Sequence, residues 1–421
     1  MISVLGSVWA LLLGTLLIML GNGMQFTLIG LRGDIEGFSA ATIAIITSGY
    51  YIGFLSGARV TPLLIRRVGH VRVFAALGSF MSAGLIALPL APEAWTWTPL
   101  RLVIGFCMSG VYVSAESWLN HAATNETRGK ILSAYMIAQT LGIIGAQWIL
   151  TFGDAATSAL FIVASILVSV SFAPILLSVT PTPVVTVTQP MSLKRLFTAA
   201  PLGTAGTFFL GSIFATQSGM AAVFGTQIGM SASQIALFVA TLFTGALFLQ
   251  YPIGWLSDVM DRRKLIFGAS VLGAAGCGLG LLSGVRPELL LPAAFLAGGV
   301  TTPLYSLFLA YTNDDLSPDE MPAASGGLVF VFGIGAIGGP LLCGWAMQVI
   351  GPQGFWLVLV VTFAIIAVYA LYRMTQRPPT PVEATDAYLN ILPTASPVAI
   401  EAATIWSADQ TEGHEESAAR E

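Results

Sequence analysis

The stretch Gly254-Trp-Leu-Ser-Asp-Val-Met-Asp-Arg-Arg-Lys264 is a short charged loop between two long apolar runs. One run ends near Leu256 and the next begins at Leu265, so the loop joins the two arms of a hydrophobic hairpin. Gly254 has no Cβ and therefore allows two helices to approach closely. Asp258 can face a helix N-terminus, and the three basic residues that end the stretch can bind the lipid surface or nearby acids.

The composition surrounding this loop excludes a soluble protein. The chain has 421 residues, of which 55% are hydrophobic and 9% charged, and its mean hydropathy is +0.82. A soluble domain carries about 25% charged residues. The three cysteines and three histidines are scattered, so we expect no disulfide framework, no metal site and no cofactor. The chain is therefore predicted to be an integral membrane protein.

The apolar runs have the length of membrane-spanning helices, which need about 20 residues each. They are too long for barrel strands and do not alternate between polar and apolar residues. We therefore expect an all-α integral membrane protein with twelve transmembrane helices. The expected spans are Val4–Leu28, Ala41–Leu64, Val71–Leu90, Trp97–Leu119, Ile131–Phe152, Ser158–Leu177, Leu202–Phe224, Gln234–Leu256, Leu265–Leu282, Leu289–Tyr311, Ala323–Ile350 and Phe355–Tyr372.

Three prolines between the sixth and seventh spans divide the chain into halves, because proline interrupts a helix. Residues 66–72 lie 192 positions before residues 258–264 with a similar pattern of charge. We expect an N-terminal six-helix bundle over 1–177, a cytoplasmic linker over 178–195 and a pseudo-symmetric C-terminal bundle over 196–373. Residues 374–421 are acidic and rich in proline, which predicts a disordered cytoplasmic tail. The alternative for its apolar part, Tyr388–Trp406, is docking on the rest of the protein.

The distribution of basic residues predicts the orientation. Thirteen of the 17 Lys and Arg residues fall on one side of the expected spans. Cytoplasmic loops carry an excess of Lys and Arg. Both termini are therefore expected in the cytoplasm.

The loop at 254–264 resembles the signature loop of the major facilitator superfamily, which joins the second and third helices of each half. The matching residues are Gly254, Leu256, Ser257, Asp258, Arg262, Arg263 and Lys264. The run Ala115-Glu-Ser-Trp-Leu-Asn120 is similar to a bacterial branch of this superfamily, the YcaD-like transporters. The resemblance implies a transporter of the bacterial inner membrane, with its substrate path between two parallel halves. Taken alone, the loop could also be an ordinary basic loop.

Two ionisable residues lie inside the fourth span. A charge at a helix centre costs about 2.5–3.5 kcal/mol, so Arg101 and Glu116 are candidates for proton coupling. Arg101-Leu-Val-Ile-Gly105 resembles an R-x3-G element that the family uses in coupling; the alternative is that Arg101 extends to the outer interface. Glu116 is either a structural acid that pairs with Arg66 or Arg67, or a proton carrier.

The first-half loop differs from the second, because Arg66 stands where the second half has Asp258. We expect one ionic clamp between Arg66 and the acids near Asp314, and a second between Asp258 and Arg128. The alternative is solvated charges worth about 0–1 kcal/mol each. The complete predicted cytoplasmic gate is Arg66, Arg67, Asp258, Arg262, Arg263, Arg128 and Asp314.

Residues Gly338, Gly339 and Pro340 resemble a family hinge element in a gating helix. Proline removes a backbone hydrogen bond and glycine permits bending. The alternative for these small residues is tight packing.

Polar side chains inside spans predict the substrate cavity. Asn22 and Gln25 lie three residues apart, and Gln139 and Gln147 eight apart, so each pair shares a helix face. The alternative for each amide is an interhelical hydrogen bond worth about 0.6 kcal/mol. The substrate-binding candidates are Asn22, Gln25, Tyr112, Gln139, Gln217 and Tyr305. Further wall candidates are Tyr50, Tyr51, Tyr135 and Trp148.

These features predict a secondary active transporter that moves a small solute by alternating access. Proton coupling and uniport are both open, as are export and import. No Walker motif is present, and no span holds a His–Glu, Cys–His or two-carboxylate pair, so neither ATP as the direct energy source nor an enzyme is expected. The expected partners are a small-molecule substrate, the lipid bilayer and, if coupled, protons, with no nucleic acid and a monomeric chain. The alternative is a non-transporting receptor or scaffold with the same fold.

Overall fold

The computed structural model describes residues 2–124, 127–177, 191–314, 316–317, 320–376, 388 and 390–403, and the side chains of these from Val8 onward except that of residue 122. Regular structure in these ranges is helical. The long helices are α1 (Ile2–Ile35), α2 (Ala40–Val68), α3 (His70–Leu90), α4 (Ala94–Ala122), α5 (Arg128–Leu150), α6 (Ala159–Leu177), α8 (Pro201–Gln227), α9 (Ala232–Ser257), α10 (Arg262–Leu282), α11 (Leu290–Asn313), α12 (Met321–Ile350) and α13 (Gly354–Met374).

These twelve helices confirm the expected all-α transmembrane fold. Eleven of them are long and apolar enough to cross a membrane. The remaining long helix, α5, is of sufficient length but carries Gln139 and Gln147, which lower its hydropathy. A short helix, α7 (Leu193–Ala199), and a 3-10 turn, η1 (Pro287–Leu289), connect longer ones.

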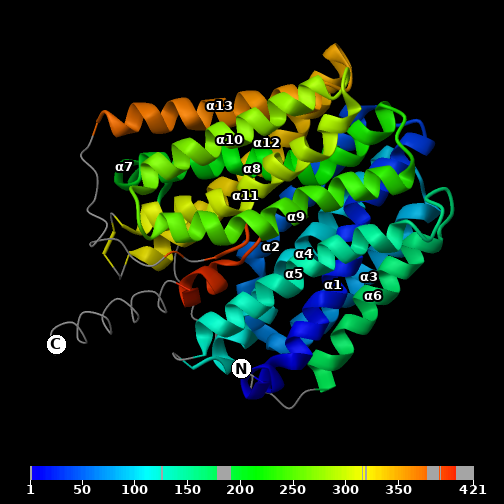
Figure 1. Cartoon of the computed structure of the whole chain (residues 1–421). Helices are drawn as coiled ribbons and strands as arrows, with labels where there is room; N and C mark the ends of the chain where they lie inside the picture. The colour runs from blue at the N-terminus through cyan, green and yellow to red at the C-terminus, as the bar shows by residue number, and fades with distance from the viewer. Residues whose placement is uncertain are drawn as a thin grey trace.

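The helices form two bundles with matching internal contacts (Figure 1). In the first bundle α2 packs on α4 and α1 on α5, and in the second α9 packs on α11 and α8 on α12. Glycines allow these close approaches, since a Cβ at Gly53 would lie 2.8 Å from the carbonyl carbon of Leu102. The equivalent Cβ at Gly245 on α9 would lie 2.9 Å from the carbonyl carbon of Phe295 on α11. The two bundles contact each other through α1 and α8, α2 and α12, and α5 and α9.

The two ends of the helices differ in charge. The basic end holds the turns after α2, α4 and α9, with Arg66, Arg67 and Arg262 among its basic residues. The opposite end holds the turns after α1, α3 and α8. There the bundles touch directly, because a Cβ at Gly30 on α1 would lie 2.6 Å from the Cβ of Ala222 on α8.

The segments expected to be irregular are partly folded. Residues 178–190 of the expected linker lie outside the described residues, but Ser192 caps α7, and Met191 donates a backbone hydrogen bond to Ala323 at 2.7 Å. Of the expected disordered tail, residues 377–387, 389 and 404–421 also lie outside the described residues. The structure differs from that expectation at Tyr388 and residues 390–403, named here the C-terminal segment. This segment lies between the two bundles near the basic end (Figure 1), where its apolar side chains are buried.

Candidate functional site

A cavity lies between the two bundles at mid-helix depth. Its volume, counted as the space open to the centres of water molecules, is about 100 Å³. Helices α1, α2, α4 and α5 of the first bundle and α8, α9, α11 and α12 of the second contribute its walls. None of the described residues that line it is charged. The cavity is therefore an apolar space with a few polar groups, as ligand sites commonly are.

A buried polar network supports one wall. Gln25 donates to Asn22 Oδ1 at 2.5 Å, and Arg101 Nη1 donates to Gln25 Oε1 at 2.7 Å. The Arg101 guanidinium also lies over the rings of Phe26, at 4.7 Å, and Tyr50, at 4.5 Å. Arg101 is fully buried, so the alternative in which it extends to the outer interface is wrong. Asn22 faces the cavity, and Arg101 acts behind it through Gln25.

A second polar contact joins α1 to α5 at the cavity. Thr27 donates from its hydroxyl to Gln147 Oε1 at 2.8 Å, and Gln147 Nε2 donates to the Gly23 carbonyl at 3.3 Å. All three residues line the cavity. Gln147 therefore combines the two roles weighed from the sequence, interhelical hydrogen bond and cavity wall.

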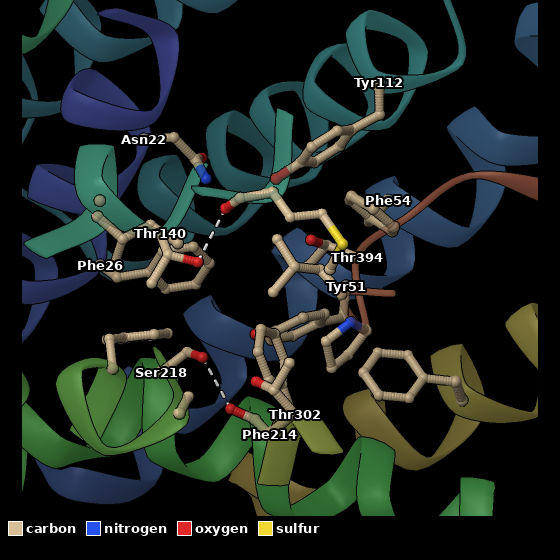
Figure 2. A pocket seen from close by; sticks show the side chains of 18 of the residues that line it. Asn22, Phe26, Tyr51, Phe54, Tyr112, Thr140, Phe214, Ser218, Thr302 and Thr394 are labelled. Carbon is tan, nitrogen blue, oxygen red and sulfur yellow. Dashed lines mark hydrogen bonds between the residues drawn. The ribbon is translucent and has the colours of Figure 1, made fainter. Parts of the chain in front are cut away.

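Aromatic rings from both bundles also line the cavity, and several of them are drawn in Figure 2. Phe26, Tyr50, Tyr51, Phe54 and Tyr112 contribute from the first bundle, and their rings contact one another at centroid distances of 4.8–6.3 Å. The second bundle contributes Phe214, Phe243 and Phe332. Such a surface suits flat or amphipathic molecules, because the rings offer large apolar faces.

The C-terminal segment forms part of the cavity wall on the side of the basic end. Asn390, Leu392, Pro393 and Thr394 belong to its lining. Figure 2 shows Thr394 among the side chains that line the cavity. The cavity is thus bounded by the helices on its sides and by the chain's own end at one mouth.

Glu116 lies at this mouth and is buried. Tyr135 donates its hydroxyl to Glu116 Oε1 at 2.9 Å, and the backbone N–H of Ser396 donates to Oε2 at 2.8 Å. Arg66 and Arg67 are exposed and form none of the ion pairs of the described chain, so the expected pairing of Glu116 with them is wrong. The carboxylate instead holds the C-terminal segment.

The expected gate residues take other partners in this conformation. Arg262 pairs with Asp314 and Arg263 with Asp261, both within the second bundle. Asp258 accepts a hydrogen bond from the Tyr388 backbone N–H at 2.8 Å. Arg128 is half-buried, and its Nε and Nη1 atoms have no partner among the described residues. The two clamps between bundles are not formed here and stay predictions for the opposite conformation.

The expected hinge on α12 shows both features weighed from the sequence. A Cβ at Gly338 would meet open space, whereas one at Gly339 would lie 2.7 Å from Ser212 Cα on α8. Ser48 on α2 donates to the Ile337 carbonyl at 2.8 Å, one turn from Pro340. This contact joins the two bundles beside the expected hinge. A single conformation does not show bending, and the hinge stays a prediction.

Some candidates do not line the cavity in the described structure. Gln217 donates to the Ala297 carbonyl at 3.1 Å and accepts from Thr301, which ties α8 to α11. Gln139 and Tyr305 are buried away from the lining, and Trp148 is 69% exposed. The prediction of Trp148 as a wall residue is wrong, because this position on α5 faces outward.

Sequence reasoning missed several lining residues. Phe54, Phe214, Phe243 and Phe332 have no polar signal that separates them from lipid-facing phenylalanines. Gln250 on α9 did carry such a signal, since it is a buried amide inside a span. It donates to the Tyr388 hydroxyl at 2.8 Å.

Two family models match the chain, one on each half. The Sugar (and other) transporter model matches residues 10–191, and the Major Facilitator Superfamily model matches residues 202–396. Together they cover both bundles.

Curated relatives cover most of the chain. It is 24% identical to the uncharacterized MFS-type transporter YfkF of Bacillus subtilis, over 82% of this chain and 90% of the relative. It is 27% identical to the uncharacterized MFS-type transporter YcaD of Escherichia fergusonii, over 81% of this chain and 89% of the relative.

Among solved structures, the nucleoside transporter NupG has the same fold. The TM-score is 0.70 at 14% identity, over 88% of this chain and 98% of that one. Fold, helix count and the two family matches agree with the signature loop at 254–264. The chain belongs to the major facilitator superfamily of membrane transporters.

Proposed function

We propose that this transporter moves a small neutral or amphipathic solute by alternating access. The observation that carries the proposal is the cavity between the bundles, lined from both and free of charged side chains in its described part. A solute held there contacts both bundles at once. Rocking of one bundle against the other would then expose it to one side of the membrane and afterwards to the other.

The structure corresponds, in this proposal, to the state closed at the opposite end. Direct contacts between α1 and α8 support it, since Gly30 leaves no space toward Ala222. The excess of basic residues supports a cytoplasmic location for the basic end and both termini, in a bacterial inner membrane. The helices would therefore leave a cytoplasmic mouth to the cavity, where the C-terminal segment lies in this structure.

Proton coupling through Glu116 fits the same arrangement. Its carboxyl group is buried at the mouth of the cavity, and its partners are a hydroxyl and a backbone amide, neither of them cationic. Protonation would neutralise Glu116 and would leave no Arg or Lys without an ionic partner, because neither of its hydrogen-bond donors is charged. Arg101 lies about 22 Å away along α4, as judged from the rise of a helix over 15 residues, so it would position the wall at Asn22 and not exchange protons with Glu116.

A thermal-shift screen of the purified protein against neutral and amphipathic metabolites tests the proposal. A ligand at about 100 times its dissociation constant adds about 2.7 kcal/mol to the free energy of unfolding. Each hit is then tested for flux into proteoliposomes. We expect Asn22→Ala to remove the shift and the flux, because Asn22 is a polar group of the wall and is held in place by Gln25.

Ser270→Ala is the matched control, since Ser270 is buried on α10 and its hydroxyl bonds only to its own helix in the described contacts. It should leave both readings unchanged. Ligand binding with no flux for any hit would contradict the proposal and favour a receptor with the transporter fold.

A further inference from the structure

We propose that the C-terminal segment is an internal ligand that seals the basic-end mouth of the cavity and holds the transporter in an autoinhibited state. The sealing follows from the contacts below, and the inhibition rests on the proposed alternating access. Three sets of contacts carry the inference. They join the segment to the second bundle, to the first bundle and to the cavity itself.

Tyr388 packs against the second bundle, on the signature loop over residues 254–264 and on the end of α9 before it. A Cβ at Gly254 would lie 2.8 Å from the Tyr388 ring, so the absence of a side chain there makes room for the tyrosine. Asp258 accepts from the Tyr388 backbone N–H at 2.8 Å, and Gln250 donates to its hydroxyl at 2.8 Å. The sequence assigned Gly254 to close helix packing and Asp258 to a clamp. Here both residues contact the C-terminal segment.

A single serine on α11 binds both backbone groups of Ile391. Ser306 Oγ accepts from the Ile391 N–H at 3.0 Å and donates to the Ile391 carbonyl at 3.1 Å. Both residues are buried. A buried peptide group must be hydrogen-bonded to avoid a penalty, and Ser306 satisfies both of its polar atoms.

The first bundle binds the segment through Glu116. The Ser396 N–H donates to Glu116 Oε2 at 2.8 Å, directly before the short helix over residues 397–403. Ile400 and Ala402 are 0% exposed, which places this helix inside the protein. The segment thus bridges α4 of one bundle to α9 and α11 of the other.

This bridge has a mechanical consequence. Closing the basic end would require the bundles to approach where the segment now lies, and packed protein interiors compress little. Residues 390 and 392–394 also form part of the cavity lining. While the segment is seated, solute has no route through this mouth and the bundles cannot rock, so release of the segment must precede transport.

Two variants of the full chain release the segment by different means. Ser306→Ala leaves the Ile391 N–H and carbonyl buried without their partner, and Ile400→Asp places a charge at a fully buried position. Glu401→Gln is the control, because Glu401 is half-exposed and the amide has nearly the same size. Hydrogen exchange of peptides over residues 388–403 reports seating without any substrate.

Thr302→Cys, a lining position on α11, reports access to the cavity. The native cysteines Cys107, Cys277 and Cys343 are at most 1% exposed and need not be replaced. In the Thr302→Cys background we expect about tenfold faster maleimide labelling from the basic end with either releasing variant, which corresponds to about 1.4 kcal/mol. The control should label like the parent.

The outcomes separate this inference from the proposed function. Protected amides in the parent, lost in both variants together with faster labelling, support the seal. Rapid exchange over 388–403 in the parent overturns it, as does unchanged labelling after release. Faster flux of any hit in the released variants supports inhibition, and equal flux in parent and variants overturns it. If neither parent nor variants transport any hit, the proposed function fails, and the inhibition with it, while the seal stands.

Discussion

The two ends of the cavity are closed by different means. At the opposite end α1 packs directly on α8, with glycine at the contact. At the basic end the C-terminal segment lies between the bundles and is hydrogen-bonded to both. A helix contact opens only when the bundles rock, whereas an inserted segment can leave without any movement of the bundles. In our proposal the contact between α1 and α8 opens and closes during each transport cycle, whereas the C-terminal segment regulates whether the cycle can proceed.

The largest expected effect comes from breaking the helix contact. Gly30→Leu places a side chain where even a Cβ would lie 2.6 Å from Ala222, and overpacking of this kind typically costs about 1–3 kcal/mol. We expect the closed opposite end to lose about tenfold to a hundredfold in population. Maleimide labelling of Thr302→Cys from the opposite end should rise accordingly.

Gly268→Leu is the control for that variant, because a Cβ at Gly268 on α10 meets open space. It should leave labelling unchanged. Labelling of Gly30→Leu equal to the parent would mean that the contact between α1 and α8 does not close this end.

A smaller effect is expected at the basic end from Glu116→Gln. The amide keeps one acceptor oxygen, so only one of the bonds from Tyr135 and Ser396 can persist. A hydrogen bond contributes about 1 kcal/mol, so the Ser396 amide should exchange about fivefold faster. If Glu116 carries the proton, uptake driven by a pH gradient should also be lost while exchange without a gradient persists. Gradient-driven uptake that survives would assign coupling elsewhere.

The smallest effect is expected in the loop that carries Asp258. Asp261 caps α10 by accepting from the Arg263 N–H at 2.9 Å. Burial alone would raise the pKa of Asp261, but hydrogen bonds from Arg263 and its charge lower the pKa overall. Asp261→Ala should cost about 1 kcal/mol in the free energy of unfolding at pH 7.

The lowered pKa fixes the sign of the pH dependence. The carboxylate stabilises the folded state above its ordinary pKa, and this contribution disappears as the pH falls through the lowered folded pKa. The parent and Asp261→Ala should therefore unfold at more similar temperatures in acid than at pH 7. Asp261→Asn, which retains a capping oxygen, should lose less than Asp261→Ala. A constant difference between parent and Asp261→Ala at all pH values would contradict the role of the charge.

The sequence alone was sufficient for the fold. Twelve apolar runs of membrane length leave few architectures, because backbone groups in lipid must bond within helices. The charged loop at 254–264 then separated this superfamily from other helical membrane proteins. Asn22 was also predictable, since a polar side chain inside a span needs a partner or a solute.

Tertiary structure decided which buried polar groups face the cavity and which join helices. Gln147 and Gln217 are both amides inside expected spans, yet Gln147 lines the cavity, whereas Gln217 is hydrogen-bonded to α11 and does not line it. The direction of each side chain depends on how the helices are rotated, and a membrane helix surrounded by protein has little hydrophobic asymmetry to reveal its rotation. Docking of the apolar part of the tail was an alternative from the sequence, but the site that receives the C-terminal segment could not be predicted. An apolar segment in an acidic, proline-rich tail gains stability only when two bundles, folded from distant parts of the chain, form the site that receives it.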